Sequence, residues 1–447
     1  MEQENKLGVM PIPRLLAVMS VPMMISFFIQ ALYNVVDSIF VAMISEDALT
    51  AVSIAYPMQN VITAIGVGTG VSVNALVPRY LGQGRGRDAE KIANVAVFLS
   101  ACYCVIFFLV GLFLVGPFYR MQTDAPAIVG AGTEYLTVVC MASLGAFFGQ
   151  NFEKLLVATG NTFASMASQA TGAVFNIIFD PLLIFGVGPF PALGVRGAAV
   201  ATVLGQIVAA VVAFTLVRKK QHAVRIHPGA MLPDRRSLKE IYSVAVPSIL
   251  TVGIGSVMNF CMNQILLAFN TTATAVFGVW MKLQNFSYMP IFGLNNGAVP
   301  VVAYNFGAGK MDRVHKTIHL ALGVALGLMA LLLLVFELIP GSLLTLFSAS
   351  ENMMNIGTTA LRLTCLSLPF GAITLILSSS FQALGHSRYT LIVNLCRQLL
   401  FMVPIAWLLS LSGRLQSVWL AVVIAEAMSS ALALALRRKV VRDFAAG

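Results

Sequence analysis

The sequence predicts an all-α polytopic membrane protein with twelve transmembrane helices in two six-helix bundles. Three observations support this prediction. Hydrophobic residues make up 58% of the 447 residues and charged residues only 10%, against roughly 25% charged in a typical soluble domain. Apolar runs of membrane-spanning length recur from end to end, and the second half repeats features of the first. No long polar stretch is left over for a soluble catalytic domain, so we do not expect an enzyme.

The spans can be placed at roughly 20 apolar residues per crossing. Those of the first half are expected near 15–44, 51–77, 92–116, 133–158, 163–186 and 195–217. Those of the second half are expected near 240–268, 274–303, 317–340, 356–384, 388–411 and 416–436. The segment before the first span carries acids and two prolines and has no small-residue cleavage site, so it is interpreted as an interfacial segment and not as a removable signal peptide.

Positive charge is divided unequally between the two sides of this topology. The odd-numbered loops carry Arg120, Arg196 and Arg414, whereas most other lysines and arginines lie in the N-terminal tail, the even-numbered loops and the C-terminus. Because cytoplasmic loops are enriched in Lys and Arg, both termini are expected in the cytoplasm. The net charge of +10 is therefore interpreted as an orientation signal in the plasma (cytoplasmic) membrane and not as a nucleic-acid-binding surface.

A shift of 225 positions relates the two halves. The segment YLGQGRGRDAEK (80–91) corresponds to NFGAGKMDRVHK (305–316). The same shift pairs Pro22 with Pro247, Asn34 with Asn259, Gly82 with Gly307 and Gly160 with Gly385. Since each repeat holds six spans, the repeats are parallel and related by an axis along the membrane normal, with a cleft between them. The predicted organisation is a first bundle over 1–217, a basic cytoplasmic linker over 218–239 and a second bundle over 240–447.

Ionisable residues inside the predicted spans indicate where function lies. Each costs about 2.5–3.5 kcal/mol at the centre of a span on insertion scales, so it needs a partner, a cavity or a role. The first half holds the acids Asp37, Glu153 and Asp180, while the second half is the more basic. Lys154 cannot face the adjacent Glu153 on a helix, so its long side chain is expected to extend toward the cytoplasmic interface.

Helical spacing groups the polar residues of the first half onto shared faces. The groups are Gln30, Asn34 and Asp37 on the first span, Asn176 and Asp180 on the fifth, and Thr202 and Gln206 on the sixth. Two carboxylates with amide and hydroxyl oxygens can bind a small hard cation such as Na⁺. Buried together they also repel each other, which favours proton uptake. The alternative is structural, with Asp37 and Asp180 paired to Lys154, Lys282 or Arg397.

Several segments resemble one family of transporters. They are SVPMMISFFIQALYNVVDSIFVAMISEDALTAVSIAYP (20–57), VPRYLGQGRGRDAEK (77–91), ATGNT (158–162), NIIFDPLLIFG (176–186) and GVRGAAVATVLGQ (194–206). They are similar to the MATE (multidrug and toxic compound extrusion) transporters, in particular to the DinF and MepA-like bacterial branch. The resemblance extends across nearly the whole chain. It implies two six-helix bundles in a V, and export of drugs or amphipathic organic cations in exchange for H⁺ or Na⁺ by alternating access.

The resemblance also implies roles for individual residues. The cation-coupling site would lie in the first bundle at Asp37, Asn176, Asp180 and Thr202, which would hold Na⁺ if coupling is to sodium, with Glu153 as a further coupling acid. Substrate-cavity candidates are Gln30, Tyr33, Asn34, Gln206, Asn259 and Lys282, and Pro22 is the candidate hinge. No acid lies in the seventh or eighth span, so a coupling site in the second bundle is not expected.

Two other functions compete with multidrug export. A flippase of the same superfamily would move a lipid-linked or large amphipathic substrate through the same cleft, and Lys282, Arg362 and Arg397 keep this alternative open. An ATP-driven pump is disfavoured because no Gly-x-x-x-x-Gly-Lys-Ser/Thr stretch occurs. We therefore expect no cofactor besides the coupling H⁺ or Na⁺. The expected partners are small amphipathic drug-like substrates and the lipid bilayer, the expected state is a monomer, and no nucleic acid is expected.

Overall fold

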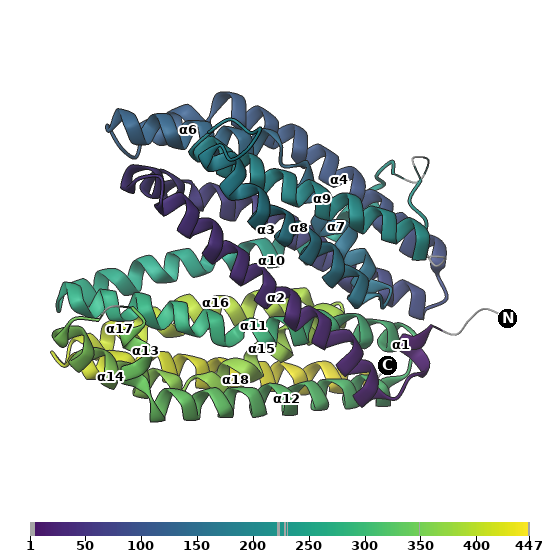
Figure 1. Ribbon diagram of the computed structural model, residues 1–447. Coiled ribbons are helices and arrows are strands. Elements are labelled where there is room, and N and C mark those ends of the chain that lie inside the picture. Colours follow the sequence, from purple (N-terminus) through teal and green to yellow (C-terminus); the bar gives the residue numbers. More distant parts are fainter. Residues whose placement is uncertain (1–4, 221–223, 228, 230, 348, 446–447) are drawn as a thin grey trace.

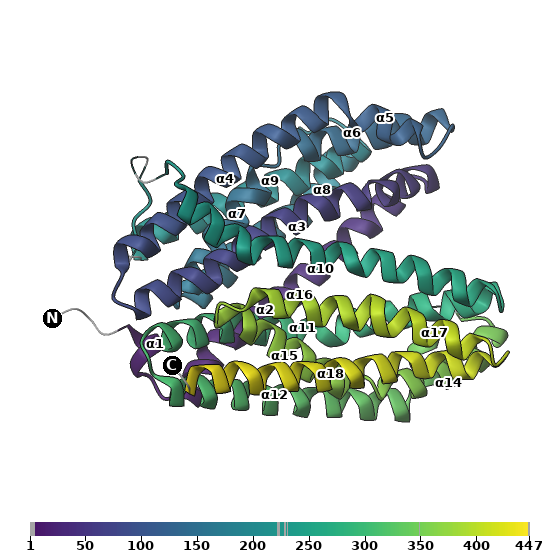
Figure 2. The same ribbon diagram turned by 180° about the vertical axis from the view of Figure 1, so that it is seen from behind.

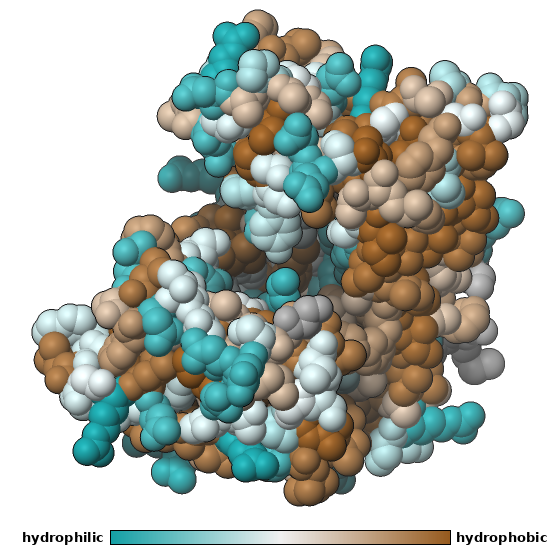
Figure 3. All heavy atoms as spheres, turned by 60° about the vertical axis from the view of Figure 1, so that its left-hand side comes forward, coloured by the Kyte–Doolittle hydropathy of each residue, from teal (hydrophilic) through white to brown (hydrophobic). Residues whose placement is uncertain are grey.

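Two lobes of helices form a V in the computed structural model (Figures 1 and 2). The structure describes residues 5–220, 224–227, 229, 231–347 and 349–445, and within these ranges it contains helices and no strand. The lobes converge at the end where the N-terminal and C-terminal segments lie and separate at the other end. We refer to these as the closed end and the open end. The space-filling view of Figure 3 shows a hollow between the lobes and a largely hydrophobic outer face at the right.

The helices follow the predicted spans closely. In the first lobe they are α2 (Ile12–Ala42), α3 (Glu46–Gly82), α4 (Gly86–Phe113), α6 (Pro126–Met141), α7 (Leu144–Ala158), α8 (Thr162–Phe185) and α9 (Val195–Lys220), with the short α1 (Lys6–Val9) and α5 (Val115–Arg120). In the second lobe they are α10 (Arg235–Leu267), α11 (Thr271–Gly307), α12 (Met311–Leu338), α13 (Pro340–Thr345), α14 (Glu351–Cys365), α15 (Leu368–Ala383), α16 (Ser387–Leu395), the π-helical η2 (Cys396–Met402), α17 (Val403–Ser410) and α18 (Leu415–Ala445).

The count of spans agrees with the prediction once two bends are recognised. Within the described ranges, 9 helices are long and apolar enough to cross a membrane, and two broken pairs raise this number to 11. The breaks lie between α6 and α7, bent by 45°, and between α14 and α15, bent by 46°. The remaining long helix, α11, spans 37 residues but carries Lys282 and several asparagines, which lower its hydropathy. With α11 the predicted twelve-span fold is confirmed.

The three-dimensional structure reproduces the repeat found in the sequence. α3 and α11 each have 37 residues, α4 and α12 each have 28, and within each pair the bounds differ by 225 positions. Left-handed glycines recur at the same shift, as Gly84 with Gly309, Gly160 with Gly385 and Gly188 with Gly413. Because φ > 0 is tolerated chiefly by glycine, these pairs mark equivalent turns. The halves are therefore structural repeats.

The first helix of each repeat contacts the opposite lobe at its beginning. The N-terminal part of α2 packs on α11, where Ser20 Oγ donates to the Leu294 carbonyl oxygen at 3.3 Å. The N-terminal part of α10 packs on α3, where Ser72 Oγ donates to the Ile241 carbonyl oxygen at 2.9 Å. Further along, α2 packs on α8 of its own lobe. α2 therefore connects the closed end of the V to the interior of the first lobe.

Candidate functional site

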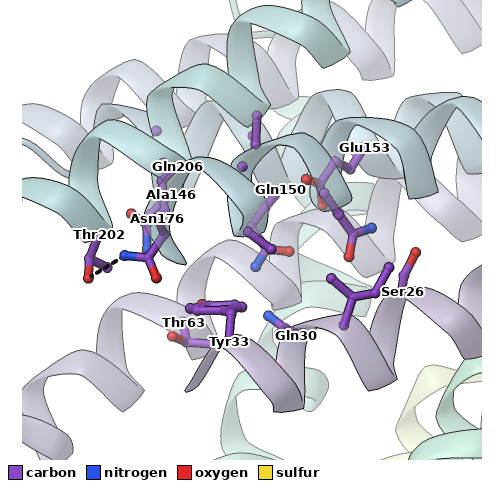
Figure 4. A pocket seen from close by; sticks show the side chains of 18 of the residues that line it. Ser26, Gln30, Tyr33, Thr63, Ala146, Gln150, Glu153, Asn176, Thr202 and Gln206 are labelled. Atoms are coloured by element: carbon purple, nitrogen blue, oxygen red, sulfur yellow. Dashed lines mark hydrogen bonds between the residues drawn. The ribbon is translucent and has the colours of Figure 1, made fainter. Parts of the chain in front are cut away.

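A cavity lies inside the first lobe among α2, α3, α7, α8 and α9 (Figure 4). Amide, hydroxyl and small side chains dominate its wall. The polar lining residues are Ser26, Gln30, Tyr33, Thr63, Gln150, Glu153, Gln169, Asn176, Thr202 and Gln206. Among the described lining residues there is one acid, Glu153, and no Lys or Arg. This polarity favours a positively charged guest over an anion.

Glycines bring α8 and α9 close enough to juxtapose their polar residues. A Cβ on Gly172 would lie 2.7 Å from the Gly205 carbonyl oxygen, and a Cβ on Gly205 would lie 2.8 Å from the Gly172 carbonyl oxygen. The helices therefore touch backbone to backbone at this level. One turn further along α8, Asn176 Nδ2 lies 3.4 Å from Thr202 Oγ1 on α9 and donates to it.

Asp180 is the most deeply placed member of this group. Its side chain is fully buried, and its Oδ1 accepts from Asn176 Nδ2 at 3.2 Å. The Asp37 carboxyl, from α2, is close enough to the Asp180 carboxyl for the two groups to interact electrostatically. Two carboxyl groups at this separation repel each other when both are ionised, so a proton or a metal cation between them is favoured. The fold thus brings together the four residues predicted for cation coupling.

Acceptor oxygens of this cluster are left without hydrogen-bond donors. They are Asp37 Oδ1, Asn176 Oδ1 and Asp180 Oδ2, each buried. Buried acceptors without partners are costly, and a bound cation or proton would satisfy them. Two carboxylates, an amide and a hydroxyl are oxygen donors of the type that hard cations prefer. The residues present therefore fit Na⁺ as well as H⁺.

The basic residues considered as structural partners of these acids lie elsewhere. Arg397 pairs with Glu426 in the second lobe, and Arg362 Nε lies 3.9 Å from Glu337 Oε2. Lys282 is exposed, with its Nζ 5.9 Å from the centroid of the Phe347 ring. Lys154 donates to Asn296 Oδ1 on α11, so its ammonium is bound to the second lobe and not to an acid of the cation site. In the described part of the chain, neither Asp37 nor Asp180 forms a salt bridge.

The second lobe contains one deeply buried ion pair. Arg397, in the π-helical turn η2, contacts Glu426 of α18 with Nη2–Oε1 at 2.6 Å and Nε–Oε1 at 2.8 Å. Their side chains are 14% and 3% exposed. Two of the charged residues inside the membrane therefore pair with each other and have a structural role.

The remaining predicted residues fall into two groups. Gln30, Tyr33, Gln206 and Glu153 line the cavity. Asn34 is exposed on α2 outside the lining, while Asn259 on α10 and Lys282 on α11 belong to the other lobe.

The sequence interpretation missed Thr63, Gln150 and Gln169, which line the cavity. Gln150 precedes Glu153 by three positions and shares its helical face, so helical spacing could have identified it.

These features define the class of protein. Twelve spanning helices in two parallel-repeat lobes, with unpaired buried acids inside one lobe, are the architecture of a membrane transporter and not of an enzyme. A family model described as MatE matches residues 22–182 and 247–408, one match in each repeat and with starts 225 positions apart. The chain belongs to the MatE family, and the predicted MepA-like MATE transporter is confirmed.

Individual relatives and solved structures agree with this assignment. The chain is 26% identical to a FAD transporter of Shewanella oneidensis over 89% of this chain and 88% of the relative. It is 25% identical to the multidrug export protein MepA of Staphylococcus aureus over 93% and 91%. A multidrug resistance MATE transporter solved in an outward-facing conformation superposes with a TM-score of 0.92 at 24% identity, covering 100% of both chains. A MOP superfamily transporter from Pyrococcus furiosus superposes with a TM-score of 0.91 at 24% identity, covering 99% and 98%.

Proposed function

We propose that the chain exports amphipathic organic cations in exchange for H⁺ or Na⁺ by alternating access. The observation that supports this most strongly is the Asp37–Asp180 pair, which is buried, lacks a basic partner among the described residues and has unfilled acceptor oxygens. A site of this kind releases free energy when a cation neutralises it. That free energy can drive a change of conformation if the two conformations bind the cation unequally.

The coupling site occupies the first lobe, and the conformational change is assigned to α2. A cation that enters from the open end neutralises one of the two carboxylates, Asp37 or Asp180, with Asn176 and Thr202 as neutral oxygen donors. Each charge that crosses the membrane potential contributes about 2.3 kcal/mol per 100 mV. Pro22 interrupts the hydrogen-bond ladder of α2, which lowers the cost of bending there. Bending of α2 would change the cavity wall at Gln30 and Tyr33 and release the substrate.

The chemistry of the cavity supports a cationic substrate. Glu153, the carboxamides and Tyr33 offer acceptors and an aromatic ring, and no basic residue lines the described wall. An anion such as FAD, or a lipid-linked phosphate moved by a flippase, would be repelled by Glu153 and would find no basic residue in the described wall. Arg397 and Arg362, which had kept the flippase alternative open, pair with acids. Lys282, the third of these residues, forms no ion pair among the described residues, and its Nζ lies 5.9 Å from the centroid of the Phe347 ring, so it is the one basic residue that still supports a flippase.

The orientation of the protein in the membrane is inferred from the unequal distribution of Lys and Arg between its loops. We assign both termini and the closed end to the cytoplasm, so the V opens to the outside of the plasma membrane. The first lobe (1–217) couples the cation, and the basic segment 218–239 links it to the second lobe (240–447). Residues 221–223, 228 and 230 of that segment lie outside the described residues. The transporter is proposed to act as a monomer.

Transport in proteoliposomes tests this function. Purified protein is reconstituted, vesicles are loaded with the fluorescent cation ethidium, and gradients of H⁺ and of Na⁺ are imposed separately. One of the gradients should accelerate ethidium movement, Asp180→Asn should abolish the acceleration, and Asp312→Asn, which neutralises an exposed acid on α12, should not. Transport of FAD in place of ethidium, or insensitivity to both gradients, would refute the proposal.

A further inference from the structure

Lys154 joins the wall of the cavity to the opposite lobe. It follows Glu153 in α7, and Glu153 lines the cavity. The Lys154 ammonium donates a hydrogen bond to Asn296 Oδ1 on α11. The residue next to the cavity acid therefore makes a polar contact that crosses from the first lobe to the second.

The acceptor on α11 is held in a fixed orientation. Asn296 Nδ2 donates to the Phe292 carbonyl oxygen at 2.8 Å, and the Asn296 backbone carbonyl accepts from Asn74 Nδ2 on α3 at 3.4 Å. Gly70 of α3 leaves room for the lysine stem, because a Cβ there would lie 2.8 Å from Lys154 Cγ. The bridge is thus built into the seam where α3, α7 and α11 meet.

The charge of Lys154 is poorly compensated. None of the ion pairs among the described residues includes Lys154, and the acceptor of its hydrogen bond to α11 is a neutral amide. Glu153 is the one acid among the described residues that interacts electrostatically with the Lys154 ammonium. Tyr33 of α2 is a further titratable group, and it interacts with Glu153. Gly70 and Asn296, the contacts from α3 and α11, carry no charge. A buried ammonium without a carboxylate partner is unfavourable, so ionised Glu153 stabilises Lys154 in this conformation.

We propose that Lys154 is the positioning residue that links the occupancy of the cation site to closure of the lobes at the closed end. This inference rests on the proposed function for the identity of the coupling cation. Glu153 is the further coupling acid of the first lobe, apart from the Asp37–Asp180 pair; when a proton neutralises it, the Lys154 ammonium remains buried with a neutral amide as its partner. Separation of the lobes at the closed end hydrates the ammonium. Cation uptake therefore destabilises the outward-open conformation and favours the inward-open one, as an exporter driven by cation entry requires.

Distances between spin labels on the two lobes test the link. The full-length protein in lipid nanodiscs carries labels at Arg87→Cys and Asp312→Cys, which are exposed equivalents near the starts of α4 and α12. The native cysteines Cys102, Cys104, Cys140, Cys261, Cys365 and Cys396 are replaced. Acidification should raise the population of long distances about fivefold or more, within the usual range of allosteric coupling. Glu153→Gln should produce the same shift at alkaline pH.

Variants of Lys154 separate its charge from its packing. Lys154→Met should abolish both the response to acid and the effect of Glu153→Gln, whereas Lys154→Arg should retain them. Lys316→Met, which removes an exposed charge on α12, serves as the matched control. Should Lys154→Met fail to fold, Asn296→Ala removes the acceptor alone and should populate long distances at alkaline pH.

Two outcomes would overturn the inference, and neither depends on ethidium export. One is an equal effect of Glu153→Gln in the presence and absence of Lys154. The other is an unchanged distance distribution in Asn296→Ala. If wild-type protein does not transport ethidium, the proposed function fails, while the label distances still decide the role of Lys154.

Discussion

Gly82 on α3 and Gly307 on α11 occupy equivalent positions in the two repeats, and each faces the backbone of the other lobe. A Cβ on Gly82 would lie 2.1 Å from the Tyr304 carbonyl oxygen, and a Cβ on Gly307 would lie 2.1 Å from the Arg79 carbonyl oxygen. Tyr304 and Arg79 are themselves related by the repeat. No side chain fits at either position unless the backbones separate, so this reciprocal contact seals the closed end.

Alanine at either glycine should therefore loosen the seal. We expect Gly82→Ala and Gly307→Ala to increase the population of long distances between labels on residues 87 and 312, because the added methyl group forces α3 and α11 apart. Gly327→Ala is the control, since a Cβ on this α12 residue meets nothing within 4 Å. Identical distance distributions in Gly82→Ala and Gly327→Ala would contradict the assigned role of the contact.

Neutralising Asp37 or Asp180 should abolish export without unfolding the protein. Neither carboxylate has a salt-bridge partner among the described residues, so Asp37→Asn and Asp180→Asn remove a buried charge and leave no base unpaired. Thermal stability in detergent should hold or rise, while ethidium transport is lost. A clear drop in melting temperature for both variants, with Asp312→Asn unaffected, would instead support a structural role.

Much of this site was predictable because it depends on local spacing. Asn176 and Asp180 lie four positions apart on one helix, and an α-helix places such residues on one face whatever surrounds it. The repeat was also visible, because the glycines that build equivalent turns occur at the same shift. The resemblance of segments 20–57 and 194–206 to the same family indicated Asp37 and Thr202 as further members of the site.

Contacts between distant helices could not be predicted in the same way. Lys154 reaches Asn296, 142 positions away, and Arg397 reaches Glu426, 29 positions away on the next span. Helical periodicity gives the face of a residue but not the neighbouring helix that this face meets. Asn259 and Lys282, expected as substrate-cavity residues, lie on α10 and α11 of the second lobe, as the predicted bounds of the bundles imply, and their contact with substrate stays a prediction.

The Arg397–Glu426 pair should be needed for stability and not for coupling. Removing one partner leaves a buried charge uncompensated, and such changes cost about 3–5 kcal/mol. We expect Glu426→Gln to lower the melting temperature strongly, and the double variant Arg397→Met with Glu426→Leu to restore most of it.

The more exposed ion pair of Arg362 with Glu337 is the comparison for the loss of stability expected at the buried Arg397–Glu426 pair. Its side chains are 54% and 35% exposed, so Glu337→Gln should cost no more than about 1 kcal/mol. Equal destabilisation by Glu426→Gln and Glu337→Gln would show that burial does not distinguish the two pairs.

Cysteine labelling from each side of the membrane checks the topology. Ser237 near the start of α10 is a poor labelling site, because it is buried and its Oγ donates to Asp234 Oδ1 at 2.6 Å. Lys239 is exposed near the start of α10, and Ser412 is exposed in the turn between α17 and α18. In a cysteine-free background, Lys239→Cys should react with an impermeant reagent from the cytoplasm and Ser412→Cys from outside. Reaction of both from one side would refute the twelve-span topology.

The N-terminal segment should act as a strap across the closed end. Leu7 in α1 is fully buried, and its carbonyl oxygen accepts from Asn305 Nδ2 at 2.9 Å. Arg313 of α12 donates from Nη2 to the Met10 carbonyl oxygen at 2.7 Å and to that of Leu7 at 3.3 Å. The Lys6 side chain lies against Gly160 of the first lobe. The segment therefore contacts both lobes, although most of its hydrogen bonds are to the second.

Removing the guanidinium should release this strap. Hydrogen bonds to charged groups contribute about 1.5–3 kcal/mol each, so we expect Arg313→Met to raise the thiol reactivity of Leu7→Cys by tenfold or more, since about 1.4 kcal/mol corresponds to a factor of ten. Arg438→Met, which removes an exposed charge on α18, should leave the reactivity unchanged. Equal reactivity of Leu7→Cys with and without Arg313 would show that apolar burial alone holds the segment in place.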